Sequence, residues 1–157
     1  MFTFTAETEV GRDPESVSDF LTDPRRFHEW TDMRDGRLLT EGPPRVGTRL
    51  SATMGSGFLT TDMTWELAAF EPGRLVDYRT VSDGQLRMDA TYRLDAQETG
   101  RTRVRVDGSV RLRGALRLLE PLLRAEIRRG EARELERAKA LLEGEAASAD
   151  ARASAVA

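Results

Sequence analysis

The amino-acid sequence predicts an α+β fold in which a curved antiparallel sheet of about seven strands is covered by a long C-terminal helix. Between residues 46 and 112, apolar and polar side chains alternate in short segments separated by turn residues, as in strands with one buried face. Two Asp-Pro pairs near the N-terminus open two short helices. An amphipathic segment, residues 115–142, follows the last strand.

The N-terminal elements are a strand and two short helices. Residues 2–10 alternate weakly between apolar and polar side chains and are expected to form the first strand. In Asp13-Pro14-Glu15 the aspartate is a typical N-cap and the proline suits the first helical position. Asp23-Pro24 repeats this signal and opens a second short helix that contains Phe27 and Trp30.

The middle of the chain contains six further predicted strands. Turn signals such as Gly42-Pro43-Pro44, Gly55-Ser56-Gly57 and Asp83-Gly84 separate them. The predicted strands are residues 34–41, 46–54, 60–70, 75–81, 86–95 and 103–112. In the strand at 75–81 we expect Val76, Tyr78 and Thr80 to face inward, because the opposite face carries Asp77 and Arg79, which would need one another if buried.

The apolar face of this sheet must be covered, and only the segment 115–142 is long enough to do so. Pro121 lies inside its pattern, so we expect either a kink there or a helix that begins at Glu120. Gly130 lies near the apolar stripe and weakens the helix. The residues expected along that stripe are Leu116, Leu119, Leu123, Ile127, Ala138 and Leu141.

Length and composition indicate one domain, residues 1–143, followed by a tail of small and polar residues, 144–157, that we expect to be disordered.

Cysteine is absent, which excludes a disulfide framework, a thiol nucleophile and thiolate metal sites. No apolar run approaches the ~20 residues of a membrane helix. The N-terminus lacks a basic flank followed by an apolar stretch, so we expect a cytoplasmic protein.

The charge pattern argues against a nucleic-acid partner. The net charge is −3, and nucleic acid usually selects a clearly basic face. Residues 101–143 are net basic, but their arginines are interleaved with glutamates, which is typical of a solvated helix with ion pairs.

Several short motifs follow one another in a fixed order and together span about residues 2–143. They are Asp13-Pro14-Glu15, Asp23-Pro24 with Phe27 and Trp30, Gly42-Pro43 with Val46-Gly47-Thr48-Arg49, residues 70–75, residues 119–124, and Glu134-Leu135 with residues 139–143. This order resembles the SRPBCC superfamily, which includes START-like lipid-binding domains, polyketide cyclases/dehydrases and plant pathogenesis-related allergens. The resemblance implies a helix-grip fold with a ligand space between sheet and helix. It does not imply one chemistry, because this architecture serves carriers and enzymes alike.

The ligand space that the resemblance implies would be lined by inward-facing apolar residues. An apolar lining with a few polar tips suits a lipid, polyketide or aromatic molecule. The expected ligand-binding residues are Leu50, Ala52, Met54, Met63, Trp65, Met88, Ala90, Tyr92, Val104, Val106, Leu119, Leu123 and Ile127. The alternative is that these side chains simply fill the core.

Candidate catalytic residues are few. On a helical wheel Glu134 falls within the apolar stripe, where burial would raise its pKa and suit it to proton transfer. Alternatively the helix is rotated past Pro121, so that Leu135, Ala138 and Leu142 face the sheet and Glu134 reaches solvent. Tyr78 and Tyr92 are further candidates for positioning and moving protons. His28 is the only histidine and is expected at the surface, so no metal site and no cofactor are predicted.

Three functions are compatible with these features. The first is binding of a small hydrophobic molecule by a monomer or homodimer. The second is a polyketide cyclase, aromatase or dehydratase that uses pocket Tyr and Glu residues. The third is a protein-interaction module. Two or more titratable side chains that converge on one spot would favour the enzyme.

Overall fold

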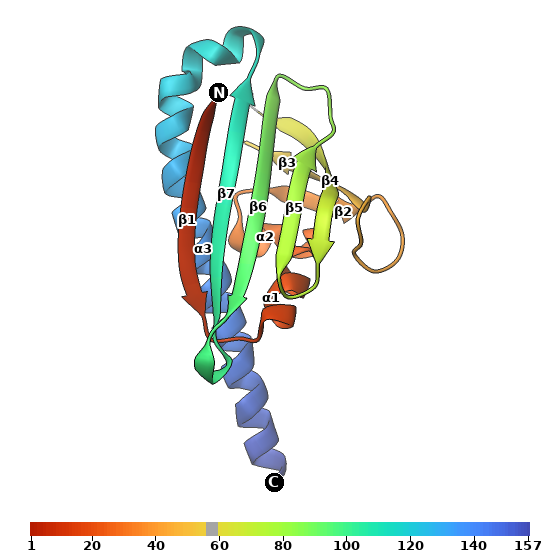
Figure 1. Cartoon of the computed structure of the whole chain (residues 1–157), viewed down its shortest axis with the longest axis vertical. Helices are drawn as coiled ribbons and strands as arrows, with labels where there is room; N and C mark the ends of the chain where they lie inside the picture. Colours follow the sequence, from red (N-terminus) through yellow and green to blue (C-terminus); the bar gives the residue numbers. More distant parts are fainter. Residues whose placement is uncertain (56–59) are drawn as a thin grey trace.

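The computed structural model describes residues 1–55 and 60–157. Within them, seven antiparallel strands form one sheet, as predicted, and their order is β1-β7-β6-β5-β4-β3-β2 (Figure 1). Apart from Gly55, the turn expected at Gly55-Ser56-Gly57 lies outside the described residues. The strands are β1 (Phe2–Val10), β2 (Arg34–Leu38), β3 (Arg49–Met54), β4 (Thr61–Glu71), β5 (Leu75–Thr80), β6 (Leu86–Ala96) and β7 (Thr102–Leu112).

The predicted N-terminal caps are present. The Asp13 side chain accepts a hydrogen bond from the Ser16 backbone N–H at 2.9 Å, and Asp23 accepts one from the Arg25 N–H at 3.1 Å. The helical segments are α1 (Pro14–Leu21), η1 (Pro24–Arg26), α2 (Phe27–Trp30), η3 (Glu98–Gly100), η4 (Gly114–Leu119) and α3 (Glu120–Val156).

Two strands are shorter than predicted. β2 ends at Leu38, and β3 begins only at Arg49. A turn precedes β3, in which Gly47 has a φ of +88° and the Thr48 N–H donates to the Arg45 carbonyl at 3.0 Å. Val46, which the predicted strand 46–54 includes, therefore lies outside β3 and is 62% exposed.

The helix α3 begins at Glu120, with Pro121 in its first turn, so the second of the two expectations for Pro121 is confirmed. It continues to Val156, whereas we expected the tail to be disordered. The Arg26 guanidinium pairs with Glu145, which holds the helix just beyond Leu142. The following residues are rich in alanine, and extending an existing helix avoids the cost of nucleation. No helix in the described ranges is long and apolar enough to cross a membrane.

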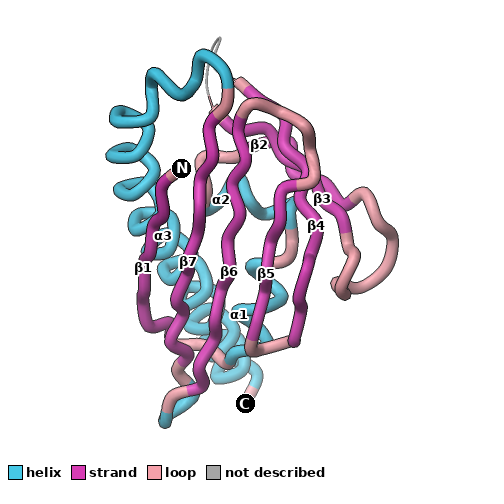
Figure 2. Tube along the Cα trace, turned by 45° about the horizontal axis from the view of Figure 1, so that its top comes forward, coloured by secondary structure: helices cyan, strands magenta, loops and turns pink. Residues whose placement is uncertain are grey.

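α3 runs alongside β1 and in the same direction (Figures 1 and 2). Arg128 donates to the Thr3 carbonyl at 3.1 Å, and the Thr8 hydroxyl donates to Glu136 at 2.7 Å. The Gly11 N–H, just after β1, donates to Glu143 at 2.8 Å. These contacts fix the position of α3 along the strand.

The rotation of α3 follows the alternative only in part: Leu135, Ala138 and Leu142 are buried as it states, but Glu134 lines a pocket between the helix and the sheet instead of reaching solvent. The buried residues of α3 are Glu131, Leu135, Ala138 and Leu142. The expected stripe is correct only in part, because Leu119 is 37% exposed and the remaining members other than Ala138 are half-buried. The 3-10 segment η4 separates Leu116 and Leu119 from the α-helical phase, since it has three residues per turn.

The inner face of β5 agrees with the prediction, since Val76, Tyr78 and Thr80 are buried. Arg79 is exposed on the outer face and donates to Asp77 at 3.0 Å. Other ion pairs on that face include Arg93 with Asp107 at 3.1 Å and Arg105 with Asp107 at 2.9 Å. The sheet therefore has one charged face and one apolar face, and the pocket lies on the apolar face.

We predict that Leu135→Ala destabilises the protein strongly. Leu135 is 3% exposed, and its truncation would leave a cavity between α3 and the sheet. The expected loss in free energy of unfolding is about 2–5 kcal/mol, measured by denaturant titration. The control is Leu122→Ala on the same helix, because Leu122 is 70% exposed. Equal losses for the two variants would contradict this packing.

Candidate functional site

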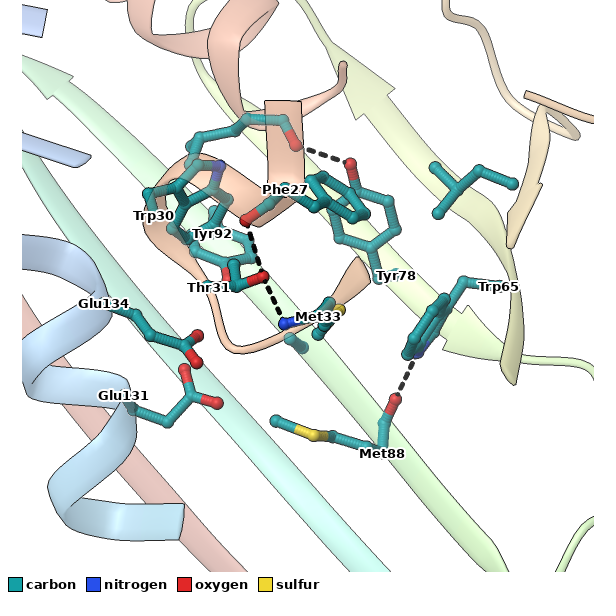
Figure 3. Close-up of a pocket in the computed structure, with 13 residues that line it drawn as sticks. Phe27, Trp30, Thr31, Met33, Trp65, Tyr78, Met88, Tyr92, Glu131 and Glu134 are labelled. Atoms are coloured by element: carbon teal, nitrogen blue, oxygen red, sulfur yellow. Dashed lines mark hydrogen bonds between the residues drawn. The ribbon is translucent and has the colours of Figure 1, made fainter. Parts of the chain in front are cut away.

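A pocket lies between the inner face of the sheet, α2 and α3 (Figure 3). Its cavity volume is about 40 Å³, enough for a few ligand atoms or ordered waters. Its lining is largely apolar and aromatic, with polar groups on the side of α3. The lining residues are Leu21, Phe27, Trp30, Thr31, Met33, Leu50, Trp65, Tyr78, Met88, Ala90, Tyr92, Glu131 and Glu134.

Aromatic rings that pack against one another form much of the wall. Phe27 and Trp30 of α2 meet edge to face, with ring centroids 6.0 Å apart. Tyr78 and Tyr92, from neighbouring strands, meet in the same way at 6.3 Å. Such contacts stabilise ring positions beyond simple burial. The aromatic wall is therefore formed before any ligand arrives.

Several polar groups of the wall are already used by the backbone. The Tyr78 hydroxyl donates to the Leu21 carbonyl at 2.8 Å, which ties β5 to the end of α1. The Trp65 indole N–H donates to the Met88 carbonyl at 2.8 Å, and the Thr31 hydroxyl donates to the Phe27 carbonyl at 2.8 Å. Burial also raises the pKa of Tyr78 far above its usual value. Tyr78 therefore holds the wall in place and is not suited to proton transfer.

Two carboxyl groups enter the pocket from α3. Glu131 and Glu134 are three residues apart and therefore share one face of the helix. Figure 3 shows both side chains pointing into the pocket and toward one another. Glu134 accepts a hydrogen bond from the Asp32 N–H at 3.2 Å. Glu131 is only 6% exposed and makes no hydrogen bond or ion pair within the described part of the chain.

The surroundings raise the pKa of both carboxyl groups. Burial is the main cause for each, and it raises the pKa of Glu131 to about 8 and that of Glu134 to about 7. The negative charge of Glu134 raises the pKa of Glu131 further. Near neutral pH the two groups titrate as a pair that keeps a proton, so the pair presents an acid and a base side by side.

Tyr92 completes the polar part of the pocket. Burial raises its pKa well above the usual value, and the charges of Glu131 and Glu134 add to that effect. Among the residues that the structure describes, its hydroxyl has no hydrogen-bond partner, although the residue is only 7% exposed. The Tyr92 hydroxyl is therefore available to a ligand.

The predicted lining is found in part. Leu50, Trp65, Met88, Ala90 and Tyr92 lie in the pocket, together with the catalytic candidates Tyr78 and Glu134. The other predicted residues do not line it: Leu119 lies in η4 and is exposed, and the rest form the hydrophobic core or pack against it. The predicted residues outside the pocket are Ala52, Met54, Met63, Val104, Val106, Leu119, Leu123 and Ile127.

Sequence reasoning missed Glu131 and the contribution of α2. Glu131 lies four residues after Ile127 and four before Leu135, so it shares their face of the helix. This spacing identifies Glu131 as buried only when the rotation of the helix is known. In the sequence Phe27 and Trp30 are an aromatic pair on a short helix, and nothing there marks them as walls of a pocket. His28 is exposed, as expected. No group of three or more His, Cys, Asp or Glu residues suited to a metal ion occurs in residues 1–55 and 60–157.

Residues 1–143 match the family model described as polyketide cyclase / dehydrase and lipid transport. No curated protein matches the sequence. Three similar solved structures indicate how widely the fold is shared, and at these low identities they show the fold alone.

One is a protein from Thermus thermophilus, with a TM-score of 0.76 and 13% identity over 92% of this chain and 99% of that one. Another is the Zhui aromatase/cyclase from Streptomyces sp. R1128, with a TM-score of 0.75 and 15% identity over 90% of this chain and 93% of that one. The di-domain aromatase/cyclase BexL of the BE-7585A pathway matches with a TM-score of 0.70 and 16% identity, over 90% of this chain and 50% of that one.

The buried pair predicts a dependence of stability on pH. A carboxyl group whose pKa is higher in the folded state stabilises the fold below its unfolded pKa, and this contribution is lost as the pH rises through the folded pKa. For Glu131 this window extends from about pH 4.5 to about pH 8. Relative to Glu131→Gln, the wild-type protein should therefore lose stability from pH 5 to pH 9, by roughly 2–4 kcal/mol at about 1.4 kcal/mol per pKa unit.

Denaturant titrations across this pH range test the expectation. Glu126→Gln is the matched control, because Glu126 lies on the same helix with its side chain 62% exposed. Parallel pH profiles for wild type and Glu131→Gln would show that Glu131 is not buried in the folded protein.

Proposed function

Since the chain belongs to the polyketide cyclase / dehydrase and lipid transport family, we propose that it binds a small, largely apolar molecule in the pocket between the sheet, α2 and α3. The observation that carries this proposal is an aromatic pocket with two carboxyl groups that face one another at its edge. A pocket of this kind orients an apolar ligand through a few polar contacts.

The size of the cavity limits how the ligand enters. A volume of about 40 Å³ admits only part of a polyketide-sized molecule. Met33 and Met88 both line the pocket, and methionine side chains change rotamer easily and fill irregular spaces. We expect the polar end of the ligand to occupy the cavity, while these methionines move aside for the apolar remainder.

A second candidate function is proton transfer on the bound molecule, as in a cyclisation or dehydration. Its support is the Glu131–Glu134 pair, in which an ionised carboxylate and a protonated carboxyl group coexist near neutral pH. The carboxylate would remove a proton from a carbon beside a carbonyl group, and the acid would donate a proton to the carbonyl oxygen. The Tyr92 hydroxyl lies in the same pocket and would position that oxygen.

We predict that filling the pocket weakens ligand binding. Trp30 and Trp65 are the only tryptophans of the chain and both line the pocket, so intrinsic fluorescence reports its occupancy. The Ala90→Leu variant should weaken binding of 2-phenylethanol about tenfold or more, because its side chain occupies the cavity. Ala125→Leu, on the exposed side of α3, should leave the affinity unchanged. Saturable binding that survives Ala90→Leu would place the ligand elsewhere, and native mass spectrometry of the protein from its host would then identify what it carries.

The proton-transfer function predicts exchange of carbon-bound hydrogen. With 2-tetralone in deuterated buffer near neutral pD, the protein should accelerate replacement of the hydrogens beside the carbonyl group about tenfold or more over buffer. Glu131→Gln and Glu134→Gln should lose this acceleration, whereas Glu126→Gln should keep it. NMR measures the exchange directly, and equal rates with and without protein would exclude the acid–base role for this class of ketone.

A further inference from the structure

We propose that the ligand of this pocket carries a positively charged nitrogen, such as a protonated amine or amidine, on an apolar body, and that Glu131, Glu134 and Tyr92 receive that nitrogen. The inference rests on the proposed function and names the chemical class of its ligand. The inference is based on the polar groups of the pocket that have bonding capacity left within the described part of the protein and can therefore bind a ligand.

The pocket contains negative charge without a matching cation. No arginine, lysine or histidine appears among its described lining residues. The basic groups nearest to the pair are engaged elsewhere, since Arg137 pairs with Asp32 at 2.9 Å and Arg133 pairs with Glu126 at 3.0 Å. Glu131 is buried and without a partner in the described ranges, which is very unfavourable for an ionised group. A cation from outside would relieve this.

The free polar groups of the pocket can all accept hydrogen bonds. The donors Tyr78 O–H, Trp65 N–H and Thr31 O–H already bind backbone carbonyl oxygens. The Trp30 indole N–H has no partner in the described residues, but it is covered by protein atoms. What remains exposed to a ligand is the two carboxyl groups and the Tyr92 oxygen, and an ammonium or amidinium group offers several N–H donors to such a set.

The aromatic wall also favours a cation. Trp30 and Phe27 lie on the α2 side of the cavity and Tyr92 on the sheet side (Figure 3). The faces of such rings attract positive charge, and the attraction is stronger where water is excluded. The cavity of about 40 Å³ has room for the few heavy atoms of a small ammonium head group. The size of the cavity, its negative charge and its hydrogen-bonding groups therefore all suit a small cationic head group.

Binding of such a cation must displace protons. Near neutral pH the carboxyl pair keeps a proton, and a positive charge beside it lowers the pKa of both groups. The other charges that act on the pair are those of Asp32, Arg133 and Arg137. Affinity for the cation should therefore rise with pH between about pH 6 and about pH 9, with release of a proton.

The test compares three probes of nearly equal shape: 2-phenylethylamine, 2-phenylethanol and phenylacetate. Tryptophan fluorescence and isothermal titration calorimetry at pH 8 measure their affinities for the full chain. We expect the amine to bind about tenfold or more tightly than the alcohol, and phenylacetate to bind more weakly than both. Calorimetry in two buffers of different ionisation enthalpy should show proton release for the amine alone.

Variants separate this inference from a general effect on the pocket. Glu131→Gln and Glu134→Gln should weaken amine binding about tenfold while leaving the alcohol within about threefold, since only the charge is removed. Glu98→Gln, at the exposed turn between β6 and β7, should change neither affinity. If the alcohol binds as tightly as the amine, the proposed preference for a cationic ligand is refuted, whereas the proposed binding function of the pocket is supported. If none of the three probes binds at millimolar concentration, both the cation and the proposed pocket function are refuted.

Discussion

The packing of α3 on the sheet is the contact on which the rest of the structure depends. Leu135, Ala138 and Leu142 bury one face of the helix against the apolar side of the strands. Because side chains three and four residues apart share a face, this contact also decides that Glu131 and Glu134 point inward. A helix rotated by one residue would present Leu116, Leu123 and Leu141 to the sheet instead. The rotation of α3 therefore determines both which residues form the core and which residues form the site.

The pocket combines features that a protein core normally avoids. Two like charges on one helix face repel one another, and burial makes each of them more costly. Their surroundings compensate them only through the Asp32 N–H that binds Glu134, because the Tyr78 hydroxyl and the Trp65 N–H are bound to backbone carbonyl oxygens. Core residues that serve only stability are expected to be apolar or fully paired. The arrangement is understandable as a binding site for a ligand that supplies the missing partner.

Most of the fold could be predicted from local chemistry, and the site only in part. Alternation along strands such as residues 86–95, and the caps at Asp13 and Asp23, are set by neighbours in sequence. The rotation of α3 is different, because leucines lie on two overlapping stripes and the 3-10 segment η4 shifts the phase between them. Glu131 and the aromatic pair of α2 could therefore not be assigned to the pocket before the tertiary packing was known.

The unpaired burial of Glu131 has a consequence for the evolutionary history of relatives. A residue that lowers stability is kept only while selection acts on what it does, since most proteins lie close to the stability they need. In lineages that no longer use the pocket, random drift should replace Glu131 by leucine or glutamine, while Leu135 and Ala138 persist because the fold itself requires them. The pattern of substitutions at these three positions would then separate relatives that still bind a ligand from those that have kept only the architecture.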